Sequence, residues 1–350
     1  MKPAARPAVP GAGDAPAGTG HAPCHHGEIL QGVFLDGDGR RCAGLVTLPM
    51  AGPGSHAEFV RRPGTPPGAL TVVPAGRTKA AQAAALAVAA CAERTGQPPC
   101  GGELRLTCDV PVGLGMGSST SDVIAAVRAV ADSYRLRLAP DAVARLAVRA
   151  ELACDPLMLD GRPVLFAQRE GRVLEVLGPA LPPLVVVGCA FGGGAPVDTL
   201  ALPVREATEA DVRDFERLRT RLRRAVATGD AHLLGQVATA SARRGQQVLG
   251  HPEFGALTAI ARRVGAAGVQ IAHSGAVAGV LFAPATPGLR HRVRSCLRAL
   301  DAHGIPATRT FTTLGNSTTF STFSAFSTFH HHRRDPEWTS TSRSRSAGRT

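Results

Sequence analysis

The chain has 350 residues, of which 44% are hydrophobic, enough for one large or two ordinary domains with a buried core. Its net charge is +12, but the arginines are scattered along predicted helix faces and lysine is almost absent, so we expect no nucleic-acid-binding stripe. No apolar segment has the length of a signal or of a membrane span, so we predict a cytoplasmic protein that makes no contact with membranes.

Hydrophobic periodicity predicts alternating strands and helices between two disordered ends, residues 1–19 and 315–350. In chain order, the first half is predicted to contain strands at 44–48 and 70–73, a helix at 78–94, a strand at 103–110, helices at 123–134 and 140–152, and a hairpin formed by 163–168 and 173–177.

A Leu-Pro-Pro linker at 181–183 divides the chain into predicted domains at 20–180 and 181–314. The second half is predicted to contain a strand at 184–189, an amphipathic helix through Phe215 and Val226, helices at 233–248 and 254–264, strands at 269–272 and 277–282, a helix at 289–303 and a strand near Arg309.

The eight cysteines form no Cys-x-x-Cys pair and no spacing typical of a zinc site. Several of them, including Cys91 and Cys189, lie in apolar runs, where a buried free thiol is the ordinary interpretation. This pattern is typical of a protein in a reducing cytosol.

The most informative stretch is 111–122, which joins a predicted strand to a predicted helix. Its three closely spaced glycines let the backbone approach a bulky anion, and the hydroxyl side chains at 118–121 lie where a helix begins. Unpaired N–H groups at a helix start favour phosphate. Glycines also serve ordinary turns, but the stretch lacks the Gly-Lys-Ser/Thr of a Walker A loop and the spacing of a dinucleotide fingerprint. We therefore predict a loop that binds a nucleoside triphosphate.

The sequence Pro-Val-Gly-Leu-Gly-Met-Gly-Ser-Ser-Thr of this loop resembles the ATP loop of the GHMP kinases, the family of galactokinase, homoserine, mevalonate and phosphomevalonate kinases. Two further segments extend the resemblance: 22–32 contains Pro-x-x-x-Gly-Glu-x-x-Gln-Gly, and 269–279 contains Ala-His-Ser-Gly-x-x-x-Gly. Both are similar to the L-threonine kinase branch, which makes O-phospho-L-threonine for cobalamin synthesis.

The resemblance implies an α+β, two-domain GHMP kinase fold, with a ribosomal-protein-S5-domain-2-like N-terminal domain and a ferredoxin-like C-terminal domain. It also implies that ATP and Mg²⁺ are required. Lys79 precedes a predicted Ala-rich helix and is expected to reach phosphate. The remaining ATP-binding residues that we expect are Pro111, Gly113, Leu114, Gly115, Met116, Gly117, Ser118, Ser119 and Thr120.

The resemblance assigns the metal to Ser118, Ser119 and Glu151, which supply the oxygen ligands that a hard divalent cation needs. The alternative for Glu151 is a solvated residue at a helix end. Asp155 is expected to orient the acceptor hydroxyl or to take its proton. However, the spacing from Glu151 is one residue longer than in the threonine kinase branch, so Asp160 stays open as a competitor. The expected catalytic residues are Asp155, Glu151 and Ser118.

Glu28 and Gln31 are expected beside the acceptor, where the Glu28 carboxylate would pair with an α-amino group or only hold a turn. His25 and His26 replace a small residue and a cysteine of the threonine kinase branch, so the pocket is open to a different hydroxyl compound. They would contact a carboxylate or phosphate, or be structural. A metal site at this histidine pair is not expected, because no third ligand lies nearby in the sequence.

His273, Ser274 and Gly275 are predicted to form a second glycine-rich turn over the phosphate or the substrate, with an ordinary turn as the alternative. The expected activity is ATP-dependent phosphorylation of a small-molecule hydroxyl, with L-threonine as the first candidate. The alternatives are a kinase for another amino acid or amino alcohol in specialised metabolism, or a catalytically inactive nucleotide-binding protein. We expect a monomer or homodimer.

Overall fold

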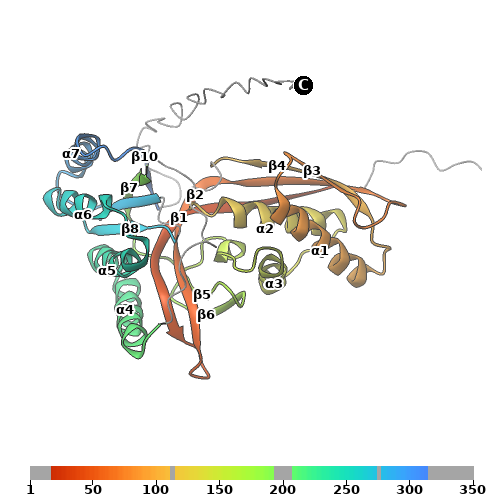
Figure 1. The fold of residues 1–350 in the computed structure, drawn as a ribbon, viewed down its shortest axis with the longest axis horizontal. Coiled ribbons are helices and arrows are strands. Elements are labelled where there is room, and N and C mark those ends of the chain that lie inside the picture. Colours follow the sequence, from red (N-terminus) through yellow and green to blue (C-terminus); the bar gives the residue numbers. More distant parts are fainter. Residues whose placement is uncertain (1–16, 111–114, 193–206, 274–276, 314–350) are drawn as a thin grey trace, which may run out of the picture.

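The computed structural model describes residues 17–110, 115–192, 207–273 and 277–313 (Figure 1). The first half contains β1 (Ala17–Leu35), β2 (Arg41–Arg62), β3 (Leu70–Val73), α1 (Thr78–Thr95), β4 (Gly101–Cys108), α2 (Ser118–Ser133), α3 (Pro140–Glu151), the 3-10 turn η1 (Pro156–Leu159), β5 (Val164–Ala167) and β6 (Arg172–Val176). The second half contains β7 (Val185–Ala190), α4 (Glu209–Thr228), α5 (Ala231–Leu249), α6 (Glu253–Arg263), β8 (Gly268–Ile271), β9 (Val277–Phe282), α7 (Leu289–Ala302) and β10 (Ala307–Thr312).

The strands of the described residues form one mixed sheet in the order β10-β7-β9-β8-β1-β2-β4-β3, with β5 joined to β2 and β6 to β5. Helices α1, α2 and α3 lie beside one end of this sheet, while α4 to α7 gather at the other end (Figure 1). The predicted α+β class is confirmed. Strands β1 and β8 pair at Glu28 and Ile271, so both halves share the sheet, and the division at 180/181 stays a prediction.

The pairing of β1 with β2 is irregular in the middle of both strands. The register shifts between Pro23 and His25, again before Glu28, and again before Leu30. Bulges of this kind bend a strand and re-aim its side chains, and both long ribbons turn sharply near the centre of Figure 1. His25 and Glu28 therefore lie where the strand changes direction.

The N-terminal part of β1 packs unusually close to α2. A Cβ atom added to Gly20 would lie 2.1 Å from the carbonyl oxygen of Ala125, and one added to Gly18 would lie 2.1 Å from the backbone nitrogen of Ser133. The opposing helix is rich in alanine and almost fully buried. Small residues on both sides thus let the backbones touch, which compensates for the scarcity of aromatic side chains in the core.

The structure corrects three predictions about the N-terminal half. Residues 17–19 belong to β1 and are not disordered, and β1 itself and most of β2 were not predicted. Helix α2 begins at Ser118, within the hydroxyl run 118–121 where a helix start was expected, and not at the bound of 123 given for the helical segment. The two strands were missed because glycine and proline punctuate them, and these residues usually interrupt strands. The termini 1–16 and 314–350 lie outside the described residues.

The remaining predicted helices and strands coincide with observed elements to within a few residues. For α4 the sequence predicted an amphipathic helix through Phe215 and Val226 without giving its ends. None of the helices α1 to α7 in the described ranges combines the length and hydropathy that crossing a bilayer requires.

We expect Gly20→Ala to lower the free energy of unfolding by roughly 1–3 kcal/mol, because a backbone oxygen of α2 blocks the new methyl group. Gly37→Ala is the matched control: it lies in the turn between β1 and β2, and an added Cβ meets no atom within 4 Å. Its effect should stay within about 0.5 kcal/mol. Urea unfolding followed by circular dichroism measures both, and equal midpoints would contradict the close packing of β1 on α2.

Candidate active site

A cavity of about 610 Å³ opens where β1, α1, α2 and the end of α3 meet. Most of the predicted site residues that the structure describes line it: His25, Glu28, Lys79, Gly115, Gly117, Ser118, Ser119, Thr120, Glu151, Asp155 and His273. Segments up to about 250 residues apart in sequence thus face one space, although Pro111, Gly113, Leu114, Ser274 and Gly275 lie outside the described residues.

The start of α2 forms one wall of this cavity. Gly117 precedes the helix with a left-handed backbone (φ 70°), and no side chain caps the first turn in the described structure. Its first N–H groups therefore have no partner within the helix and point toward the cavity side of the helix start. The positive end of the helix dipole adds to this preference for an anion.

Hydrogen bonds fix this helix start against the two long strands. The Ser121 hydroxyl donates to the Ala22 carbonyl oxygen at 2.8 Å, and the Ser55 hydroxyl donates to Asp122 at 2.6 Å. The backbone N–H of His25 donates to the Met116 carbonyl oxygen at 3.2 Å. Met116 itself is buried in an apolar cluster and does not line the cavity.

Glu151 ends α3 with its carboxylate against the first turn of α2. Ser119 Oγ donates to Glu151 Oε2 at 3.1 Å, and Thr120 Oγ1 donates to Glu151 Oε1 at 2.7 Å. The side chain is 3% exposed, which excludes the alternative of a solvated residue at a helix end. Burial raises the pKa of Glu151 to about 7, against the opposing effect of the Thr120 hydrogen bond.

The oxygen atoms around Glu151 fit a hard divalent cation, because a carboxylate and two hydroxyl groups converge beside a helix start. Lys79 Nζ lies 3.9 Å from Glu151 Oε2, and its side chain is half-exposed at the rim. A cation and a phosphate group would both find suitable partners here. Ser118 is buried and lines the same wall.

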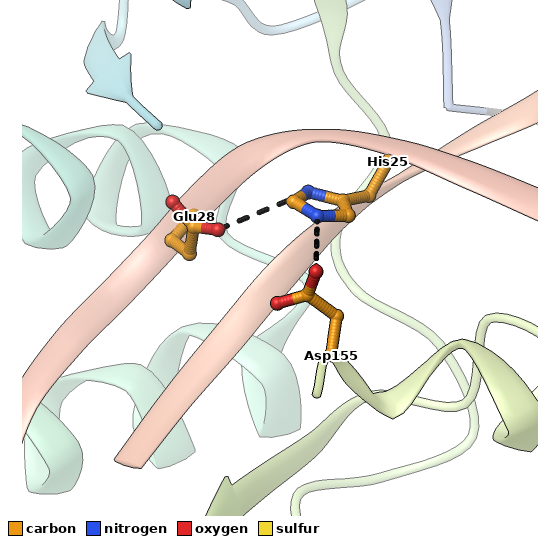
Figure 2. A group of neighbouring side chains, drawn as sticks. All are labelled: His25, Glu28 and Asp155. Atoms are coloured by element: carbon orange, nitrogen blue, oxygen red, sulfur yellow. Dashed lines mark hydrogen bonds and ion pairs between the residues drawn. The ribbon is translucent and has the colours of Figure 1, made fainter. Parts of the chain in front are cut away.

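Beside the start of α2, His25 joins two carboxylates (Figure 2). His25 Nε2 lies 3.1 Å from Asp155 Oδ2, and His25 Nδ1 lies 3.9 Å from Glu28 Oε1 and 3.2 Å from the carbonyl oxygen of Gly27. A Cβ on Gly117 would lie 2.3 Å from the His25 ring, so glycine is required there for the ring to reach Asp155 past α2.

The charges of this trio depend on one another. Burial alone would lower the pKa of His25, but the charge and hydrogen bond of Asp155 raise it to about 9. Burial would likewise raise the pKa of Asp155, but the charge of His25 lowers it below its usual range. At neutral pH we therefore infer an imidazolium–carboxylate pair. Burial raises the pKa of Glu28 to about 8.

His25, Glu28 and Asp155 also lie close enough to hold a metal ion, since one possible ligand atom of each falls within 4.8 Å of the others. The expectation that no third ligand lies near His25 is therefore wrong in three dimensions. Nevertheless, the two ring nitrogens face different carboxylates (Figure 2). This geometry suits a protonated imidazole, which donates on both sides, better than one shared cation.

Two predicted substrate-binding residues lie outside the cavity lining. His26 is fully buried, its Nδ1 lies 2.7 Å from Gln270 Nε2, its ring packs 5.1 Å from that of Phe311, and burial lowers its pKa to about 3. Its position is that of a neutral core residue. Among the residues that the structure describes, Gln31 contacts the site through His273, whose Nδ1 lies 2.8 Å from Gln31 Oε1.

Asp155 and Asp160, the two candidates for contact with the acceptor hydroxyl, differ in their exposure and in their position relative to the cavity. Asp155 is one-fifth exposed and lines the cavity. Asp160 is 69% exposed and pairs with Arg128 at 3.0 Å, and it does not line the cavity.

Sequence reasoning missed five polar residues that line the cavity. Arg77 and Thr78 lie at the start of α1, Asp122 lies near the start of α2, and Gln168 and Arg169 lie in the turn between β5 and β6. Arg77 Nη1 pairs with Asp122 Oδ2 at 2.9 Å. The adjacency of Asp122 to the loop motif was the available signal for that residue, whereas no local pattern distinguishes the other four.

Comparisons with known proteins agree with this arrangement. Residues 80–157, from α1 to η1, match the family model described as the GHMP kinases N terminal domain. Over 174 residues the chain is 26% identical to an L-threonine kinase from Citrobacter freundii, a match that covers 49% of this chain and 59% of the relative. The chain thus spans about three fifths of that relative's length.

Among solved structures, a homoserine kinase from Cytophaga hutchinsonii superposes with a TM-score of 0.61 at 15% identity, covering 89% of this chain and 98% of that one. A phosphomevalonate kinase from Streptococcus pneumoniae gives a TM-score of 0.59 at 13% identity, covering 85% of this chain and 98% of that one. These two structures show the shared fold. The family model and the L-threonine kinase relative support the resemblance to the GHMP kinases that the sequence motifs predict.

Proposed function

We propose that the protein is an ATP- and Mg²⁺-dependent kinase that phosphorylates the hydroxyl group of a small amino acid, with L-threonine as the first candidate. The observation that carries the proposal is the single cavity in which the start of α2 and Glu151 face the His25–Asp155 pair. The similarity to an L-threonine kinase supports the same chemistry. A role of the product in cobalamin synthesis belongs to the same proposal.

The start of α2 would bind the triphosphate of ATP through its backbone N–H groups. Lys79 at the rim would add positive charge. Glu151 and the hydroxyl groups of Ser118 and Ser119 would hold Mg²⁺, which, when bound, neutralises phosphate charge during transfer. Phosphoryl transfer asks a protein mainly for positioning and electrostatic stabilisation, and these groups provide both.

Asp155 would accept a hydrogen bond from the acceptor hydroxyl and take its proton as the acceptor oxygen bonds to the γ-phosphorus of ATP and the bond from that phosphorus to the bridging oxygen of ADP breaks. His25 makes this possible as a positioning residue. Its imidazolium orients the Asp155 carboxylate through the 3.1 Å contact and keeps it ionised.

Glu28 would bind the ammonium group of the acceptor. Its Oε2 atom is buried and has no hydrogen-bond partner among the residues that the structure describes. Leaving a buried acceptor unpaired is costly, and an ammonium group would satisfy it. A cation at this point would also return Glu28 to its ionised form, because opposite charge lowers a carboxyl pKa.

A panel of hydroxyl compounds tests the proposal. With ATP and Mg²⁺, we expect ADP release with L-threonine, and mass spectrometry should detect O-phospho-L-threonine. Mevalonate and galactose lack an ammonium group and should give no release above background. Release with an amino alcohol alone would favour the alternative acceptor, and no release with any compound despite ATP binding would indicate an inactive nucleotide-binding protein.

Asp155→Ala should lower kcat roughly 100-fold or more, because it removes the group that accepts the proton. Asp160→Ala is the matched control and should keep near-normal kcat, because Asp160 lies on the exposed side of η1 away from the cavity. Steady-state ADP release measures both variants. Near-normal turnover of Asp155→Ala would remove Asp155 from the mechanism.

The raised pKa of His25 predicts a pH dependence of stability. The folded pKa of about 9 exceeds the usual 6.5, so the stabilisation from protonated His25 is fully present below about pH 6.5 and is lost as pH rises through 9. Each unit of separation is worth about 1.4 kcal/mol. The difference in unfolding free energy between wild type and His25→Gln should therefore shrink across this range, as measured by urea unfolding at several pH values. A constant difference would contradict the imidazolium assignment.

A further inference from the structure

The cationic side chains that line the cavity differ in how they are neutralised. Arg77 pairs with Asp122. Lys79 lies beside Glu151. Arg169 also lines the cavity and is exposed, and no ion pair joins it to a carboxylate among the residues that the structure describes. Its guanidinium group is thus available to an anionic part of a ligand.

The fold places Arg169 at the acceptor end of the cavity. It lies in the turn between β5 and β6, and the backbone N–H of Cys154 donates to the Gln168 carbonyl oxygen at 2.9 Å. This bond ties the turn to the segment that carries Asp155. Partial desolvation lowers the pKa of His273, and the charge of Arg169 acts in the same direction, as expected for close neighbours.

The acceptor end of the cavity therefore offers two groups of opposite charge. The buried Glu28 Oε2 atom has no hydrogen-bond partner among the described residues, and the exposed Arg169 guanidinium group is not paired with a described carboxylate. An α-amino acid carries the two complementary charges, whereas an amino alcohol lacks the carboxylate. Guanidinium binds carboxylate through two parallel hydrogen bonds that an ammonium side chain cannot reproduce. We propose that Arg169 binds the α-carboxylate of the acceptor and so makes this site select amino acids over amino alcohols. The inference rests on the proposed function.

The test compares L-threonine with 1-amino-2-propanol, which is threonine without its carboxylate. Arg169→Ala should raise the KM for L-threonine roughly 10- to 100-fold, with a much smaller change in kcat because the carboxylate is not the reacting group. The KM for 1-amino-2-propanol should not rise. Arg169→Lys should recover part of the loss, since it restores the charge without the planar fork.

Arg162→Ala is the matched control, because Arg162 is an exposed arginine that does not line the cavity, and its kinetics should equal those of wild type. Calorimetric titration of L-threonine with a non-hydrolysable ATP analogue present should show the same loss of affinity in Arg169→Ala. An unchanged KM for L-threonine in Arg169→Ala, or a rise in the KM for ATP instead, would overturn the inference while leaving the kinase proposal intact. A wild-type protein that phosphorylates no amino acid would overturn both.

Discussion

The close contact between the first part of β1 and the backbone of α2 is the constraint on which the active site depends. Gly18 and Gly20 let the helix lie directly on the strand. The start of the helix then falls beside the bulged middle of the same strand, where the His25 N–H donates to the Met116 carbonyl oxygen. The groups proposed to bind nucleotide and acceptor thus share one support, and their separation is set by backbone contact rather than by adaptable side chains.

The cavity is lined by four carboxylates, which differ in how closely a cation compensates each of them. Asp155 and Asp122 each have a positive partner at close range, from His25 and Arg77 respectively. Glu151 and Glu28 are less well compensated, and burial raises the pKa of both. Bound cations would complete the charge balance. Because the folded protein already holds these charged groups in position, they need little rearrangement during the reaction.

The sequence was informative where function depends on neighbouring residues. The loop around Gly117 and the hydroxyl groups after it were recognisable, because glycine spacing and a helix start are local properties. The resemblance then pointed to Glu151 and Asp155, and both line the cavity. The contact between His25 and Asp155 spans 130 positions and involves a bulge, so no local pattern could predict it.

The sequence analysis placed both His25 and His26 beside the acceptor, but of the two only His25 lines the cavity. Neighbouring residues on a strand point to opposite faces, so His25 and His26 cannot easily share a cavity. This argument needs β1 to be identified first, and the glycines and prolines of β1 concealed it. Arg169 was missed for a related reason: a charged residue in a tight hairpin turn is ordinarily solvated.

The pairing of Glu28 with Ile271 has a consequence for how the molecule can be divided. One strand of a single continuous sheet supplies a ligand-facing carboxylate and also forms the hydrogen-bonded border between the two halves. A chain truncated before β8 would leave the edge of β1 uncovered, and an unprotected edge strand invites self-association. The N-terminal half therefore cannot be cut from the rest of the chain without exposing the edge of β1.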